Sequence, residues 1–364
     1  MAMVLTFGEV MLRLSTPERL RFGQCLPGAM STGFGGGEAN VAVSLAHLGT
    51  QAAFMSALPS GTISDCLLAE LRGHSVDTSR IRLCKEGRFG IYFLETGSNQ
   101  RPSVVIYDRD GSSISLARAA SYDFAGALDG VTWVHTTGIT PSLSKAAYEA
   151  TCMLVQAAGS RGLPVSVDLN FRKKLWRWDA AREPKALAQA CMTEILKHTT
   201  LVIANEEDAA DVLGIHATGT SVEDGQIAAG AYVEVAREIT RRFPTVQRVA
   251  ITLRESYSAD HNNWGALLYE RATDKAFFAP LDAAGAYRPY AIHNIVDRVG
   301  GGDSFGAGLI HALRSSRFSA PADAIRFAVA ASALKHTIAG DFNLVSETDV
   351  ESLMKGSGSG RVQR

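Results

Sequence analysis

The chain has 364 residues, of which 46% are hydrophobic and 20% charged, and its formal net charge is −1. This composition is typical of a globular protein with a sizeable core, and the balanced charge without a lysine/arginine run argues against a nucleic-acid or anionic-membrane partner. No stretch approaches the roughly 18 uninterrupted apolar residues that span a bilayer. Five widely spaced cysteines without a Cys-x-x-Cys pattern predict reduced thiols rather than a disulfide framework or a zinc site.

The N-terminal run MAMVLTFGEVMLRL is apolar but short, lacks a basic leading region and contains Glu9. We interpret it as a first strand rather than a signal peptide, and we expect a cytoplasmic protein. The next predicted elements are a helix that ends at Gly49, a strand and a second helix, at 38–49, 51–58 and 64–74.

A second series of elements runs strand, helix, strand, helix, strand, over 131–138, 145–159, 163–170, 184–198 and 200–208. Such alternation predicts an α/β fold, doubly wound, with a mostly parallel sheet and helices on both faces. Ligands bind beyond the carboxyl ends of the strands in such sheets, and here polar residues including Asn170 and Asn205 end two of the strands.

Two segments, 11–34 and 88–116, break the alternation. The first has no helical period, and the second holds the strand runs GIYFLE (90–95) and SVVIYD (103–108) around a Gly/Asn/Pro turn, which predicts a β-hairpin. We expect these segments to form a small β-sheet lid on one domain of about residues 1–350, since a lid excludes water from a reaction. The Gly/Ser-rich tail, 355–364, is predicted to be flexible.

The P-loop, G-x-G-x-x-G and H-E-x-x-H motifs are absent from the sequence, and glycine-rich sequence in two places remains. In the first, GFGGGEAN (33–40), the glycines precede a predicted helix with Asn40 in its first turn. Free N–H groups at the helix start and the donor and acceptor of the Asn40 amide suit a polyhydroxyl ligand. A tight turn, with Asn40 exposed or capping, is the alternative.

The second glycine-rich stretch is DRVGGGDSFGAG (297–308), which leads into a helix with Phe305, Leu309 and Leu313 on one face. The simplest interpretation makes Asp303 the helix N-cap. A cap needs no glycine triplet, however, and two further glycines inside the helix, Gly306 and Gly308, each cost about 1 kcal/mol relative to alanine. We therefore expect a ligand to approach the helix start closely.

An anion hole would explain this stretch. The N–H groups of Gly300, Gly301 and Gly302, aided by the helix dipole, would face a phosphoryl group. Asp303 would face a neutral hydroxyl as its general base, since an ordinary aspartate pKa of about 3.9 leaves it ionised at neutral pH.

Together, GGGEANVAVSLAHLG and DRVGGGDSFGAG resemble the two signatures of the ribokinase-type (PfkB) carbohydrate kinases, and the resemblance covers about residues 3–350. It implies a doubly wound α/β domain with a small β lid, and phosphoryl transfer from ATP with Mg²⁺. The first motif would bind the sugar, and the second would supply the anion hole and the catalytic aspartate. A requirement for a monovalent cation stays open.

Within that family the Arg-Val of DRVGGGD, with GIYFLE, YDRDGSS and VDLNFRKKLW, is similar to the 2-keto-3-deoxygluconate kinases. This resemblance implies a sugar acid as substrate, bound by Asp303 and by Gly36, Gly37, Asn40, Tyr92, Tyr107, Arg109 and Arg172. The two arginines favour an acid because a guanidinium fork binds carboxylates bidentately. As alternatives, the tyrosines pack the hairpin and Arg172 belongs to a solvated face.

On the nucleotide side, NEED (205–208) resembles the family's Asn-x-x-Glu, with Asp208 in the glutamate position, from which we expect it to reach Mg²⁺ through water. Relatives have Leu-Gly-x-x-Gly where this chain has LRESYSADHNN (253–263), which we interpret as an irregular polar loop. The predicted nucleotide-binding residues are Asn170, Asn205, Thr252, Arg254, Gly300 and Gly302.

Two other functions stay open: a kinase of a neutral sugar or nucleoside, and a sugar-binding regulator that has lost catalysis. The sequence does not separate gluconate from galactonate epimers. Because exposed lid strands often pair and dimers are common among relatives, we also predict a homodimer.

Overall fold

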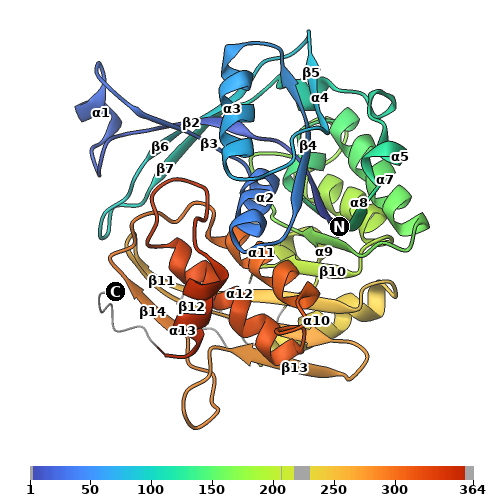
Figure 1. The fold of residues 1–364 in the computed structure, drawn as a ribbon, viewed down its shortest axis with the longest axis vertical. Helices are drawn as coiled ribbons and strands as arrows, with labels where there is room; N and C mark the ends of the chain where they lie inside the picture. The colour runs from blue at the N-terminus through green and yellow to red at the C-terminus, as the bar shows by residue number, and fades with distance from the viewer. Residues whose placement is uncertain (1–2, 206, 217–229, 357–364) are drawn as a thin grey trace.

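A ten-stranded sheet forms the centre of the molecule in this computed structural model, which describes residues 3–205, 207–216 and 230–356 (Figure 1). From edge to edge its strands are β13 (Lys275–Ala279), β12 (His261–Glu270), β11 (Arg248–Ser258), β10 (Leu201–Ala204), β9 (Val165–Asp168), β8 (Val131–Thr137), β1 (Met3–Phe7), β4 (Ala52–Pro59) and β5 (Ile81–Cys84), and β14 (Tyr290–His293) also pairs with β12. Neighbours from β11 to β5 are parallel, whereas β12 joins β11 antiparallel.

Helices cover both faces of this sheet because alternate strand residues point to opposite sides; Val4 packs in one core, and Leu5 and Phe7 in the other. On the Val4 side lie α2 (Gly37–His47), α3 (Thr62–Gly73), α11 (Gly301–Arg314), α12 (Pro321–Lys335) and α13 (Glu347–Met354). On the other side lie α4 (Ser113–Leu116), η1 (Ala119–Ser121), α5 (Phe124–Ala127), α7 (Lys145–Ser160), α8 (Pro184–Leu196), α9 (Asp208–Leu213) and α10 (Ala231–Arg242). The short α6 (Ile139–Ser142) follows β8. The predicted doubly wound α/β class is confirmed.

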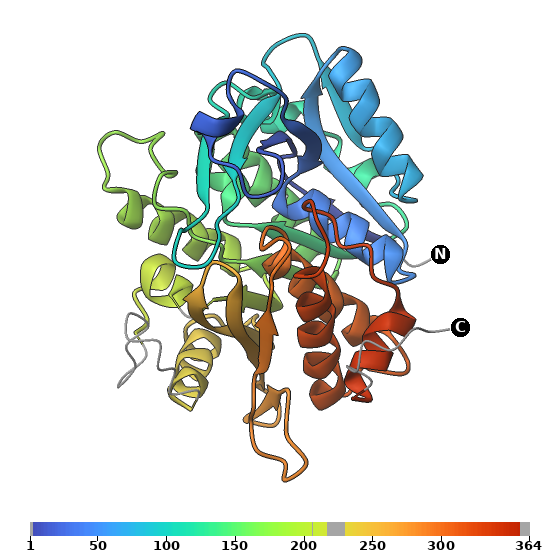
Figure 2. The ribbon, with the colours of Figure 1, turned by 90° about the vertical axis from the view of Figure 1, so that its left-hand side faces the viewer.

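A separate four-stranded sheet, the lid sheet, stands off one side of the central sheet (Figures 1 and 2). Its strands, in spatial order, are β3 (Ser31–Gly35), β2 (Met11–Ser15), β6 (Gly90–Glu95) and β7 (Val104–Asp108), and α1 (Phe22–Cys25) lies between β2 and β3 in sequence. These strands lie in the two segments from which we expected lid strands, and β6 and β7 form the expected antiparallel hairpin.

The polar segment 253–263 is not the irregular loop that we expected. It belongs to a long hairpin in which Arg254 pairs with Trp264 and Ser256 with Asn262. The prediction was wrong because the segment has no apolar alternation. Its strand conformation comes from pairing with β12, which the local sequence does not reveal.

The start of α11 also corrects an expectation, because its N-cap is Gly300 and Asp303 is its third residue. Gly300 has φ +82°, and a Cβ there would lie 2.1 Å from the backbone oxygen of Asp341. Gly308 has a packing role rather than the ligand contact that we expected. A Cβ on it would lie 3.1 Å from Ala328 Cα, so this glycine allows α12 to pack closely on α11.

Other expectations concern the whole chain. All five cysteines have free thiols, as predicted. No helix in the described ranges is long and apolar enough to cross a membrane. The predicted flexible tail lies, from residue 357 on, outside the described residues.

Candidate active site

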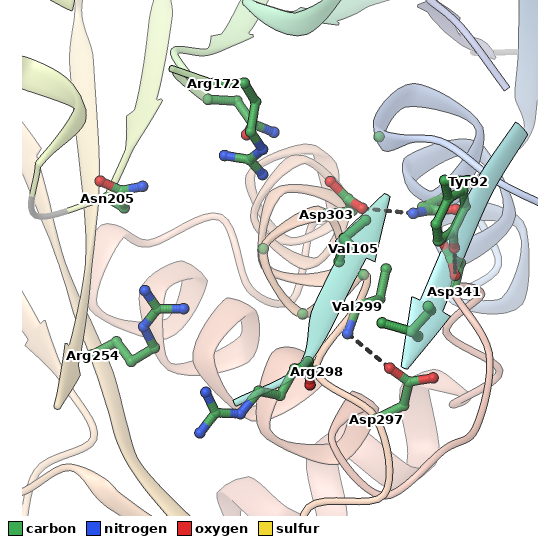
Figure 3. Close-up of a pocket in the computed structure, with 18 of the residues that line it drawn as sticks. Tyr92, Val105, Arg172, Asn205, Arg254, Asp297, Arg298, Val299, Asp303 and Asp341 are labelled. Atoms are coloured by element: carbon green, nitrogen blue, oxygen red, sulfur yellow. Dashed lines mark hydrogen bonds between the residues drawn. The ribbon is translucent and has the colours of Figure 1, made fainter. Parts of the chain in front are cut away.

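A cavity of about 930 Å³ lies between the lid sheet and the carboxyl ends of β9 and β10 (Figure 3). Its walls come from sequence positions far apart, among them β2, α2, β6, β7, β11 and the start of α11. All the site residues predicted from the sequence line it: Gly36, Gly37, Asn40, Tyr92, Tyr107, Arg109, Asn170, Arg172, Asn205, Asp208, Thr252, Arg254, Gly300, Gly301, Gly302 and Asp303.

The two glycine-rich motifs meet in this cavity. The Asn40 Nδ2 group donates to Asp303 Oδ2 at 2.7 Å, and Asn40 Oδ1 accepts from the Gly36 N–H at 3.2 Å. Asn40 is buried, which excludes the exposed alternative. A Cβ on Gly37 would lie 3.5 Å from Asp303 Oδ1, so the start of α2 packs against the carboxylate.

The environment of Asp303 changes its proton affinity. The pKa of Asp303 is raised to about 6, mainly by burial. The charge of Asp341 also raises this pKa, whereas the hydrogen bond from Asn40 and the charge of Arg172 lower it. We expected an ordinary pKa, which is wrong, but the carboxyl group is still mostly ionised at pH 7. A carboxylate in this state suits a general base.

Of the three glycines in the triplet, Gly302 is the most open. It is exposed at the cavity, and no atom lies within 4 Å of where its Cβ would stand. The Gly301 N–H instead donates to the Arg298 carbonyl at 3.3 Å. Because N–H groups in the first turn of a helix lack partners within the helix, this end of α11 presents donors and the positive end of its dipole.

Buried polar contacts join the lid sheet to the loop before α11, which holds Asp297, and to the loop after α12, which holds Asp341. Arg13 on β2 donates to Asp341 Oδ1 and to Asp297 Oδ2, both at 2.6 Å, and the Tyr92 hydroxyl on β6 donates to Asp341 Oδ1 at 2.5 Å. Burial raises the pKa of Asp341, and Arg13 opposes this rise. Sequence reasoning missed Arg13, because nothing in the local pattern MLRLS indicates partners that lie 284 and 328 residues away.

Arg109, at the end of β7, is less free than we expected. Its Nε donates to Glu9 Oε2 at 2.8 Å and its Nη2 donates to the same oxygen, so one edge of the guanidinium fork is already paired. The group also lies 5.3 Å from the centroid of the Tyr107 ring, which is 43% exposed. In the sequence Glu9 is only an acid within an apolar run, and nothing near it indicates a contact with Arg109.

Arg172 extends into the cavity from the segment after β9, on the same side as Asp303 (Figure 3). Its charge lowers the pKa of Asp168, Asp208 and Asp303, although burial outweighs it at each carboxyl group. Arg172 is exposed, as the alternative of a solvated position held, and it also lines the cavity near three acids.

Asp208 holds two loops together. Its Oδ1 accepts from the Phe171 N–H at 3.0 Å and its Oδ2 from the Asn205 N–H at 3.1 Å, while Asn205 Oδ1 accepts from the Asp208 N–H at 2.9 Å. Burial, Asp208 and Asp303 together raise the pKa of Asp168. Mutual repulsion among the three carboxyl groups is the feature that a divalent cation would relieve.

A complete protein cage for a metal is not present in the described part of the chain, because no group of three or more His, Cys, Asp or Glu side chains is placed to hold an ion. Mg²⁺ commonly keeps several waters and binds through one or two carboxylates plus substrate phosphates. The cavity acids fit that kind of site, and the role of Asp208 through water stays a prediction.

Comparisons with known proteins show which proteins the chain resembles in sequence and fold. The family model of the pfkB family carbohydrate kinases matches residues 1–237. A Haloferax volcanii protein named 2-dehydro-3-deoxygalactonokinase is 32% identical over 99% of this chain and 98% of its own length.

Among solved structures, the 2-dehydro-3-deoxygluconokinase of Thermotoga maritima is 40% identical, with a TM-score of 0.86 over 98% of this chain and 100% of that one. A candidate ribokinase II from Escherichia coli, in complex with ATP and Mg²⁺, covers 98% of this chain and 100% of its own with a TM-score of 0.75. At 19% identity it shows the fold alone.

Proposed function

The chain belongs to the pfkB family of carbohydrate kinases, and from this premise we propose that it phosphorylates the terminal hydroxyl of 2-keto-3-deoxygluconate, or of a close sugar acid, with ATP. Two relatives that match nearly the full length are named for the gluconate and galactonate forms of this acid, also called 2-dehydro-3-deoxy acids. The observation that carries the proposal is the contact between Asn40 and Asp303 beside the open Gly302.

In the proposed reaction, Asp303 accepts the proton of the terminal hydroxyl as its oxygen forms a bond to the γ-phosphorus. The bond from that phosphorus to the bridging oxygen breaks, and ADP leaves with the electron pair. The N–H groups of Gly300 and Gly302 stabilise the charge spread over the transferred group, whereas the Gly301 N–H, also predicted from the sequence, donates to the Arg298 carbonyl in the structure. Asn40 orients Asp303 through its hydrogen bond and leaves the second carboxylate oxygen for the hydroxyl.

The acid group of the substrate is proposed to bind Arg109 and Arg172, which enter the cavity from the lid sheet and from the segment after β9. Arg109 would use the edge of its guanidinium that Glu9 does not occupy. Gly36, Gly37 and the two cavity tyrosines, Tyr92 and Tyr107, would contact the rest of the sugar acid.

We propose that the nucleotide lies along Asn170, Asn205, Thr252 and Arg254, with Mg²⁺ held by phosphates and by water on Asp208 and Asp168. When bound, Mg²⁺ neutralises phosphate charge. Its fit rests on the raised proton affinity of Asp168 beside two other acids.

The lid sheet also supports the predicted homodimer. Its outer face carries apolar side chains on all four strands, among them Leu12, Phe34, Phe93 and Ile106, and Ile106 is 50% exposed. An apolar sheet face of this kind is unusual on a monomer.

A phosphorylation screen over keto-deoxy sugar acids and neutral sugars, with ATP and Mg²⁺, tests the proposed function. We expect wild type to phosphorylate a sugar acid and Asp303→Asn to lose at least about a thousandfold in kcat. Activity on neutral sugars alone would overturn the sugar-acid assignment. No turnover of any sugar would favour a binding protein, and equal rates for both proteins would remove Asp303 as the base.

A further inference from the structure

Two segments in which this chain departs from the family pattern contact each other in the structure. Arg298 belongs to DRVGGGD, at the position where many relatives have threonine, and 253–263 stands in place of the glycine loop. The Arg298 Nη2 group donates to the backbone oxygen of Ser258 and, at 2.6 Å, to Asn262 Oδ1. The Arg298 side chain thus connects the segment before α11 to the tip of the β11–β12 hairpin.

The environment of Arg298 is short of negative charge. Its two hydrogen-bond acceptors, Ser258 O and Asn262 Oδ1, are neutral, and burial together with the nearby Arg254 lowers the pKa of Arg298. The acid that raises the pKa of Arg298, Asp260, already accepts from Arg19 at 2.7 Å and from Ser258 Oγ at 2.8 Å. A half-buried cation beside a second cation is costly unless an anion joins them.

The Arg298 side chain retains an unused donor. Its Nε is buried and has no hydrogen-bond partner in the described part of the chain. Both Arg298 and Arg254 line the cavity, and Figure 3 shows their guanidinium groups on the side of the cavity that also holds Asn205. Arg298 is only two residues before Gly300, the N-cap of α11. An anion bound at the start of α11 would therefore lie near the Arg298 side chain.

We propose that Arg298, together with Arg254, binds the β- and γ-phosphates of the nucleotide. In this chain the two guanidinium groups take the place of the backbone amides that the glycine loop supplies in relatives. Both Nη2 hydrogens of Arg298 are already donated, so its Nη1 group would bind a phosphate oxygen, and the weak hydration of a guanidinium suits a partly closed site. The inference rests on the proposed function in one respect: the transferred phosphoryl group lies at Gly300–Gly302.

Calorimetric binding separates phosphate recognition from nucleoside recognition. MgATP, MgADP, AMP and inorganic tripolyphosphate are titrated into wild type, Arg298→Gln, Arg254→Gln and Arg248→Gln. Arg248 is the matched control. It lies on β11, as Arg254 does, but it pairs with Glu270 and does not line the cavity.

For Arg298→Gln we expect ATP, ADP and tripolyphosphate to bind about 10- to 100-fold more weakly, the range of one charge-assisted hydrogen bond, and AMP to change less than about twofold. Arg254→Gln should show the same pattern more weakly because Arg254 is exposed. Arg298→Lys should recover part of the tripolyphosphate affinity, and Arg248→Gln should bind all four as wild type does.

An equal loss of AMP and ATP binding would mean that Arg298 only holds the hairpin, and unchanged binding of all four would also overturn the proposal. If Arg298→Gln does not fold, the tripolyphosphate affinities of Arg298→Lys and Arg254→Gln test the proposal instead. Arg298→Lys keeps a cationic donor at this position, and Arg254 is exposed, so both variants are expected to fold. Turnover assays separate the two proposals. A wild type that binds tripolyphosphate through Arg298 but phosphorylates no sugar refutes the proposed function alone.

Discussion

The carboxyl group of Asp303 has neighbours that act on its proton affinity in opposite directions. Burial raises the pKa of Asp303 to about 6, and the hydrogen bond from Asn40 lowers it. As the pH falls through 6, the base becomes protonated and cannot accept the proton of the hydroxyl. We therefore predict that kcat/KM falls about tenfold per pH unit below pH 6, as measured in initial-rate assays from pH 4.5 to 8.

In Asn40→Ala the acidic limb should move to higher pH, because the interaction that lowers the pKa of Asp303 is gone. A limb that stays in place, or a wild-type limb near pH 4, would contradict this assignment of the base.

The glycines of α11 differ in what an added methyl group would meet. At Gly302 it would meet nothing within 4 Å, so Gly302→Ala should fold at least as stably as wild type, since alanine favours a helix by up to about 1 kcal/mol. The methyl group would nevertheless stand in the cavity, and we predict a fall of at least about tenfold in kcat. Thermal unfolding and turnover, measured together, check both parts.

Gly306→Ala is the matched control, because Gly306 lies in the same helix but does not line the cavity. It should keep both stability and activity. Equal activity of the two variants would show that Gly302 does not face the phosphoryl group.

At the scale of elements, a buried cation attaches the lid sheet to the loops before α11 and after α12. Arg13 on β2 lies between Asp297 and Asp341, and its side chain is 8% exposed. Removal of the cation leaves two buried carboxylates with only their remaining hydrogen bonds and the nearby Lys335, and breaking a buried ion pair typically costs about 3–5 kcal/mol. We predict a loss of this size in the free energy of unfolding for Arg13→Met at pH 7, measured by urea denaturation.

Arg13→Met combined with Asp341→Asn should recover part of that stability, since one uncompensated charge is gone. A single-variant loss below about 1 kcal/mol would mean that water or nearby groups satisfy both acids, and that the lid is held by its apolar contacts instead.

At the scale of the whole molecule, the lid sheet has two unequal faces. Tyr92 and Leu94 on β6 are buried on the cavity side with Met11, whereas the alternate residues on β7, Val104 and Ile106, are 41% and 50% exposed. We predict that two copies pair through this outer face. Light scattering coupled to size exclusion should show a dimer for wild type and a monomer for Val104→Lys combined with Ile106→Lys.

The double variant should keep its thermal stability as a monomer, because neither side chain belongs to a core. A monomeric wild type at micromolar concentration would refute the predicted homodimer and leave the catalytic assignments intact.

Much of the molecule follows from local patterns in the sequence. The alternation of strand and helix runs determines the α/β class, because each element must bury an apolar face or stripe. The two glycine-rich motifs predict the cavity walls, because glycines at helix starts permit close approach of a ligand or, as at Gly300, of another backbone segment. All the predicted site residues consequently line one cavity.

Tertiary structure alone decided how these residues are paired and charged. The contact of Asn40 with Asp303 spans 263 residues, and that of Arg109 with Glu9 spans 100. The pKa of Asp303 depends on burial, which has no local sequence signal. The β11–β12 hairpin exists through cross-strand pairing of polar residues, and Gly300 is the N-cap because Asp341 leaves no room for a side chain. Sequence periodicity records which face of an element is apolar, whereas pairing and desolvation depend on what the rest of the chain places against it.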